Sequence, residues 1–307
     1  MRLAEAGSAL AIALFLAGPA AAFCRTTTKA APADFSPTPD APCFTAGLPL
    51  YWKSACVGFT MQQAGSRQIS FDGAVQALTA GFARWRGASC PAVAGASAVS
   101  VEVRYLGPVT CDKVEYNNDT RIGNANVIIF RDDDWPHDDP NNTLALTTVT
   151  YNPATGELYD ADMEINTKEH KFTVSDPVPA DGVDFGSAIT HEAGHFLGLA
   201  HSVDEHATMF ARYAPGATTM RNLASDDVAG ICSAYGPDAT RSTGSGVIEA
   251  SACDPTPRHG FASACGVPVS SGCTAAPTDR APGPWLLGVA AAAIAAARVR
   301  ARRAAKP

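Results

Sequence analysis

The stretch HEAGHFLGLAH, residues 191–201, decides the fold that this sequence predicts. His191 and His195 are four residues apart, so on a helix both imidazoles project from one face, one turn apart. Gly198 lets the helix end and the chain turn back, which brings His201 to the same place. Neutral imidazoles are typical zinc ligands, and three protein ligands leave one coordination position open, as in catalytic sites. We therefore expect one catalytic Zn²⁺ held by these three histidines.

Two further residues complete the pattern. Glu192 follows the first histidine, where it can contact a metal-bound water without ligating the metal. Met209 lies eight residues beyond His201, and a methionine turn is expected after such a histidine pattern. Over residues 185–213 the sequence resembles the matrixins, the matrix-metalloprotease-like branch of the metzincins. A buried amphipathic helix that carries histidines by chance is a poor alternative, because the chain has only seven histidines.

The resemblance implies an α+β fold of the zincin type. A twisted, mainly parallel sheet with one antiparallel edge strand would pack on two long helices, with a third helix toward the C-terminus. It also implies a zinc endopeptidase in which Glu192 is the general base and Met209 forms the apolar floor beneath the histidines. Leu144 and Ala145 correspond to the edge strand that pairs with an extended substrate. Tyr213 corresponds to the wall of the pocket for the residue just after the scissile bond.

Some residues depart from the matrixin pattern. Leu146 stands where the family places a histidine of a second, structural zinc, so we expect that zinc to be absent. Ala211 replaces a family proline, which leaves the side-chain preference of the pocket open. The loop 131–139 holds five aspartates and could bind Ca²⁺, although its spacing is not that of an EF-hand and a solvated acidic loop is the alternative.

Apolar periodicity predicts the surrounding elements. Asp184 is the expected N-cap of the helix that carries the histidines. The predicted strands are 57–61, 99–105, 124–130, 144–150 and 157–166, and the other predicted helices are 71–85 and 225–235.

The ends of the chain differ in composition from its centre. A short apolar run followed by small residues predicts a secretory signal, and the apolar segment with its arginine cluster near residue 300 resembles myxobacterial sorting signals, with an ordinary membrane anchor as the alternative. The expected organisation is a signal peptide at 1–22, an extended leader at 23–50, a metalloprotease domain at 51–237, a Ser/Gly/Pro-rich linker at 238–283 and a sorting or anchor segment at 284–307.

Nine cysteines in an exported chain favour disulfides. Cys90 and Cys111 flank one predicted strand, and Cys253 and Cys265 bracket a short loop, so bridges within these two pairs are expected.

Composition also limits the partners. The net charge of −7 and the lack of a basic stripe in the central region give no reason to expect nucleic acid. We expect protein or peptide substrates, a monomer, contact with a membrane only through the C-terminal tail, and a location at the cell surface, at the outer membrane or in the medium. The alternatives are a surface-displayed zinc-binding adhesion module that does not cleave, and a zinc hydrolase that acts on a non-peptide bond.

Overall fold

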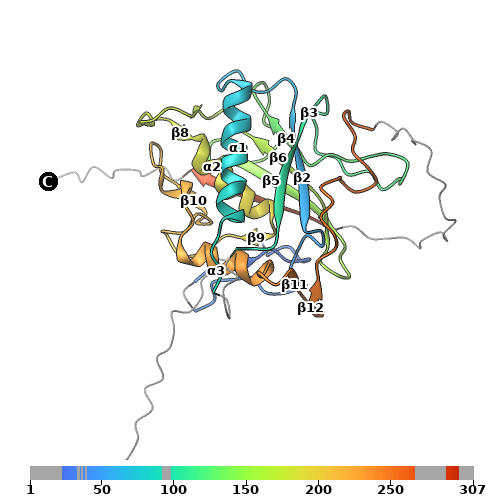
Figure 1. Ribbon diagram of the computed structural model, residues 1–307. Coiled ribbons are helices and arrows are strands. Elements are labelled where there is room, and N and C mark those ends of the chain that lie inside the picture. Colours follow the sequence, from blue (N-terminus) through green and yellow to red (C-terminus); the bar gives the residue numbers. More distant parts are fainter. Residues whose placement is uncertain are drawn as a thin grey trace, which may run out of the picture.

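The structure is a computed structural model that describes residues 23–266, except 33, 34, 36, 39 and 92–97, and the backbone of 288–296. Three α-helices and one large mixed sheet form its centre (Figure 1). The helices are α1 (Phe71–Arg86), α2 (Phe185–Phe196) and α3 (Ser225–Ala234), with a short 3₁₀ turn, η1 (Thr219–Arg221).

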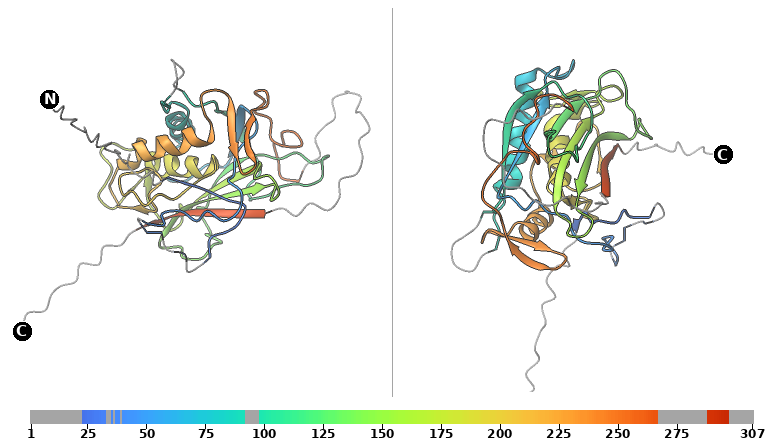
Figure 2. Two further views of the ribbon diagram at one scale, coloured as in Figure 1. Left: turned by 90° about the horizontal axis from the view of Figure 1, so that it is seen from below. Right: turned by 90° about the vertical axis from the view of Figure 1, so that its right-hand side faces the viewer.

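The large sheet has seven strands in the order β10-β13-β5-β6-β4-β2-β3. Its strands are β2 (Cys56–Gln62), β3 (Glu102–Val109), β4 (Val127–Phe130), β5 (Thr143–Tyr151), β6 (Leu158–Ile165), β10 (Arg212–Tyr213) and β13 (Gly288–Ala296). β5 runs antiparallel to both of its neighbours, and the other pairs are parallel. The expected α+β class with a mainly parallel sheet is confirmed. β5, however, was expected at the sheet edge, and in the structure β13 pairs along it (Figure 2).

Three two-stranded ladders surround this sheet. β1 (Cys24–Arg25) pairs with β9 (Leu199–Ala200), so part of the expected leader lies beside the turn that follows α2. The other ladders join β7 (Phe172–Thr173) to β8 (Val183–Asp184), and β11 (Thr240–Thr243) to β12 (Gly246–Glu249).

The core has two parts, one on each face of β4. Ile128 and Phe130 belong to the main core, which includes the buried faces of α1 and α2, whereas Val127 and Ile129 belong to a smaller cluster. Successive side chains of a strand point to opposite faces, so a strand covered on both faces is apolar throughout. This explains the continuous apolar run that predicted the strand.

The two expected disulfides are wrong. Cys90 is bonded to Cys232 and Cys111 to Cys265, while Cys253 is bonded to Cys56; a fourth bridge joins Cys24 to Cys43. Cys90 packs in the main core and Cys111 in the smaller cluster on the other face of the sheet. Disulfide-bonded Cα atoms lie within about 7 Å of each other, and these two cysteines are bonded to partners within their own clusters.

The described part of the expected linker, 238–266, is folded against the domain. It contains the β11–β12 hairpin and is held by Cys253 and Cys265, and within it Arg241 is fully buried. Residues 1–22, 267–287 and 297–307 lie outside the described residues, so the signal peptide and most of the sorting segment stay predictions. Within the described residues, no helix is long and apolar enough to cross a membrane.

Candidate metal centre

The helix that carries the candidate ligands begins at a strong cap. Asp184 is 1 % exposed, and its carboxylate accepts a hydrogen bond from the Ser187 backbone N–H at 2.8 Å. Arg221 donates to both carboxylate oxygens of Asp184, each at 2.8 Å. The predicted N-cap is therefore confirmed, and its buried charge is balanced by an arginine that no local pattern indicated.

The structure brings the three predicted zinc ligands together. The Nε2 atom of His195 lies 3.0 Å from Nε2 of His191 and 3.2 Å from Nε2 of His201. The chain reverses at Gly198, whose φ is +87°, and a Cβ atom there would lie 2.8 Å from the Leu50 carbonyl oxygen. This position therefore requires glycine for two reasons, its positive φ and the close backbone.

The tautomers of the two buried histidines are set by backbone carbonyls. His191 Nδ1 lies 2.7 Å from the Thr208 oxygen and His195 Nδ1 lies 2.9 Å from the Leu199 oxygen. A carbonyl only accepts, so each Nδ1 carries the proton and each Nε2 presents its lone pair to the common point. Burial lowers the pKa of His195 to about 3 and that of His191 well below its usual range, so both rings are neutral.

This donor set fits a zinc ion. Lone pairs about 3 Å apart repel one another unless a cation lies between them. A tetrahedral zinc with Zn–N bonds of about 2.0–2.1 Å places its nitrogen ligands about 3.3 Å apart, close to the separations found here. His191, His195 and His201 form a group whose ligand atoms all lie within 4.8 Å of one another.

Glu192 lies beside the histidines with its carboxyl group fully buried. Its Oε2 accepts a hydrogen bond from the Thr147 hydroxyl at 2.5 Å, and Oε1 has no hydrogen-bond partner among the described residues. Burial raises the pKa of Glu192 to about 8, although the Thr147 hydrogen bond opposes this shift. A buried oxygen without a partner among the described residues, beside the converging imidazole nitrogens, indicates a place for a polar ligand.

Met209 lies under the histidine helix, as the methionine-turn prediction requires. It is 2 % exposed, and a Cβ atom on Gly194 of α2 would lie 2.2 Å from its sulfur atom. The turn is held from α3, because the Asp227 carboxylate accepts hydrogen bonds from the backbone N–H groups of Thr208 (2.7 Å) and Met209 (3.0 Å).

We expect Gly194→Ala to destabilise the protein by about 1–3 kcal/mol, the usual cost of overpacking a filled core. The added methyl group would displace the Met209 sulfur and also meets Trp85 at 2.8 Å. Gly186→Ala, on the same helix, is the matched control, because its Cβ would meet nothing closer than 3.6 Å. Urea unfolding with the disulfides intact gives the midpoint concentration, and hence the stability, of each variant. Equal midpoints for the two variants would contradict the close contact.

The predicted substrate-binding residues lie on the two strands that flank β13. Leu144 and Ala145 belong to β5 and are fully buried. Tyr213 belongs to β10, and its hydroxyl donates to the Ala217 oxygen at 2.6 Å and accepts from the Asp184 N–H at 2.8 Å. Their roles stay predictions.

Sequence reasoning missed two side chains that hold the centre. Thr147 hydrogen-bonds Glu192 from the middle of β5, and Asp227 orders the methionine turn. The sequence indicates Asp227 only as an acidic residue in the first turn of the predicted helix 225–235. Thr147 lies three residues after Leu144 in a predicted strand, and no local pattern distinguishes it from its neighbour Thr148.

The acidic loop 131–139 contacts other parts of the domain. Asp132 accepts a hydrogen bond from the Arg67 backbone N–H at 2.8 Å, and Asp133 forms an ion pair with the Arg67 side chain. His137 Nε2 lies 2.6 Å from a Glu164 oxygen. Calcium binding by this loop stays a prediction.

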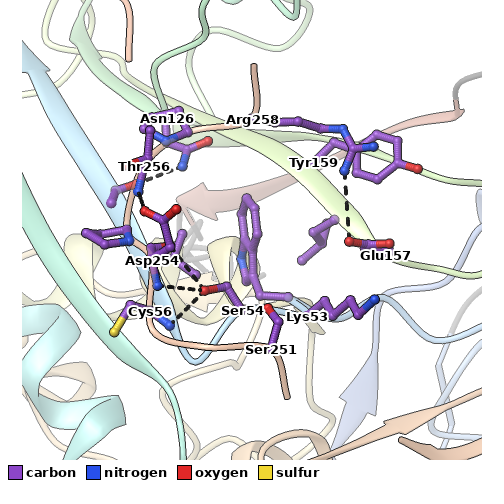
Figure 3. Close-up of a pocket in the computed structure, with 16 residues that line it drawn as sticks. Lys53, Ser54, Cys56, Asn126, Glu157, Tyr159, Ser251, Asp254, Thr256 and Arg258 are labelled. Atoms are coloured by element: carbon purple, nitrogen blue, oxygen red, sulfur yellow. Dashed lines mark hydrogen bonds and ion pairs between the residues drawn. The ribbon is translucent and has the colours of Figure 1, made fainter. Parts of the chain in front are cut away.

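A hollow separate from the metal centre lies beside the segment 251–258 (Figure 3). The Ser54 hydroxyl donates to the Asp254 backbone oxygen at 3.1 Å, and Arg258 stacks 3.7 Å from the centroid of the Tyr159 ring. None of the predicted site residues lines this hollow. Its contacts attach the segment to the domain.

Comparison with known proteins finds one family model. Residues 110–236 match the model described as Matrixin. Matrilysin from Homo sapiens is 36% identical over 104 residues, which are 34% of this chain and 36% of matrilysin. Matrix metalloproteinase-20 from Homo sapiens is 36% identical over 105 residues, 34% of this chain and 20% of that protein. Metalloendoproteinase 1-MMP from Arabidopsis thaliana is 48% identical over 56 residues, 18% of this chain and 15% of that protein. The chain thus spans about a third or less of each of these relatives.

Proposed function

Residues 110–236 belong to the matrixin family of metzincins, and on this premise we propose that the protein is an exported zinc-dependent endopeptidase. One observation carries the proposal. The Nε2 atom of His195 on α2 lies 3.0 Å from that of His191 and 3.2 Å from that of His201, which follows the helix, and a buried oxygen of the neighbouring Glu192 has no partner among the described residues. His191, His195 and His201 are the proposed ligands. Disulfides in the structure support export, because such bonds persist in oxidising compartments.

A zinc ion held by these imidazoles would supply Lewis acidity and a water of low pKa, and its positive charge would lower the pKa of Glu192 and favour the carboxylate form. Glu192 is the proposed general base, which takes a proton from the attacking water and later gives it to the departing amine. Thr147 keeps one carboxylate oxygen of Glu192 occupied, so the other is directed to the reaction. Asp227 and Met209 keep the floor of the site rigid, and Tyr213 bounds the pocket beyond the scissile bond.

The proposed substrate is an extended segment of protein chain. A peptide can pair with a strand through backbone groups alone, and such pairing depends little on side chains. Leu144 and Ala145 of β5 are the proposed backbone partners. An adhesion module that holds zinc without cleaving would keep the same three histidines.

Zinc content and cleavage, measured together, test the proposal. We expect one zinc per chain, cleavage of an unfolded protein that stops with a chelator, and recovery when zinc is restored. His201→Ala should lose zinc, whereas His206→Ala, an exposed histidine of the same turn, should retain it. The adhesion module would be favoured if the protein binds zinc tightly but does not cleave. This result should be checked both for the 307-residue chain and for a variant in which β13 is not paired with β5. A folded chain without zinc would refute the proposal.

A further inference from the structure

The substrate edge of β5 carries a strand of this same chain. β13 pairs antiparallel with β5 from Gly288, opposite Tyr151, to Ala295, opposite Thr143. At its other side β13 pairs in parallel with β10, where Ala296 lies opposite Tyr213. One strand thus lies between the two elements to which the proposed function assigns substrate binding.

The register places this strand across the reacting centre. Ala292 lies opposite Thr147, whose hydroxyl binds the Glu192 carboxylate. β13 also passes beside α2, the helix that carries His191 and His195. A peptide that entered the cleft to reach Glu192 would need the same edge of β5, because each strand edge can pair with one neighbour only.

The composition of the strand suits this position. The sequence GVAAAAIAA, residues 288–296, has no charged side chain, so it can lie in the cleft without desolvating a charge. Alanine is a poor strand former, so the pairing depends on the backbone ladders to β5 and β10. Such a segment binds through backbone hydrogen bonds, as an extended peptide substrate would, and an extended peptide can therefore displace it.

We propose that Gly288–Ala296 occupies the substrate cleft in cis and competes with external substrates. The inference rests on the proposed function only in calling the cleft a substrate site. A tethered segment acts at an effective concentration of about 1 mM, so for an intrinsic Kd of about 10–100 µM it would lower kcat/KM roughly 10- to 100-fold. The cleft accordingly prefers extended, uncharged segments rich in small residues.

The first test unpairs the strand within the 307-residue chain. Neighbouring residues of an antiparallel strand alternate in pointing their N–H groups at the partner, so one of Ala291 and Ala292 donates to β5. The double variant A291P/A292P therefore breaks the ladder in either register. We expect kcat/KM for an uncharged external peptide to rise 10- to 100-fold, mainly through a lower apparent KM. The matched variant A291S/A292S keeps both N–H groups and should behave as the parent.

The second test needs no catalysis. The same two double variants are made in a Glu192→Gln background, and a labelled peptide of sequence GVAAAAIAA is added while its fluorescence anisotropy is followed. We expect the proline variant to bind the peptide at least tenfold more tightly than the serine variant. A thermal melt and zinc content equal to the parent's show that the proline variant is folded.

The outcomes separate the two proposals. If the proline variant binds the peptide more tightly than the serine variant but no variant cleaves, the proposed function is refuted and the proposal that β13 occupies the cleft is supported. If the proline and serine variants cleave at the same rate and bind the peptide equally, the proposal that β13 occupies the cleft is refuted and the proposed endopeptidase function is supported.

Discussion

Replacing Glu192 with glutamine is expected to lower kcat by about 10²- to 10⁴-fold, the usual contribution of a general acid–base group. Glutamine has nearly the same shape, and its carbonyl oxygen can still accept the Thr147 hydrogen bond. It cannot take a proton from water at neutral pH. The fall should therefore appear in kcat, with KM little changed, in steady-state assays of a fluorogenic peptide.

Zinc content distinguishes a lost base from a lost metal site. Glu192 is not one of the converging imidazole ligands, so the variant should retain one zinc per chain by elemental analysis. Glu205→Gln, an exposed glutamate beyond the third histidine, is the matched control and should keep the parental rate. A Glu192→Gln protein that cleaves at the parental rate would assign the base to another group.

Replacing Arg241 with methionine is expected to cost about 3–5 kcal/mol of stability. The side chain is fully buried and donates five hydrogen bonds, four of them to backbone carbonyls: to Trp52, Ser54, Ser100 and Thr240 oxygens and to the Ser100 hydroxyl. Methionine fills much of the volume but leaves these acceptors unpaired, at about 1–3 kcal/mol for each acceptor that water does not reach. The melting temperature should fall by roughly 10 °C, at about 2–4 °C per kcal/mol.

Arg104→Met is the control, because Arg104 is an exposed arginine on β3 of the same domain. Its melting temperature should stay within about 2 °C of the parent's, as surface substitutions usually change stability by less than 0.5 kcal/mol. Both melts are followed by circular dichroism under non-reducing conditions. A parental melting temperature for Arg241→Met would mean that the hydrogen bonds of Arg241 do not stabilise the domain.

Sequence reasoning succeeded where a contact is local. The N-cap Asp184 and the strand predicted at 124–130 follow from neighbouring residue types; the structure has the N-cap, and it has the strand at Val127–Phe130. It failed for residues 238–266, where a Ser/Gly/Pro-rich composition predicted a linker. Such a composition is equally typical of a folded loop that is tied down by disulfides and one buried arginine. What distinguishes a folded loop from a linker here is the set of partners elsewhere in the chain: Cys56, Cys111 and the backbone carbonyls that bind Arg241.

The sequence by itself determined which side chains form the candidate metal centre, because the four-residue spacing of His191 and His195 places both imidazoles on one helix face. It also placed His201, because Gly198 ends that helix in the one conformation that turns the chain back. Only the tertiary structure decided which groups support this centre. These groups come from elsewhere in the chain: Thr147 binds Glu192, Asp227 binds the Met209 backbone, and Arg221 binds Asp184. The strand β13 pairs with β5. Their contacts depend on distances across the folded sheet, and no local periodicity records such distances.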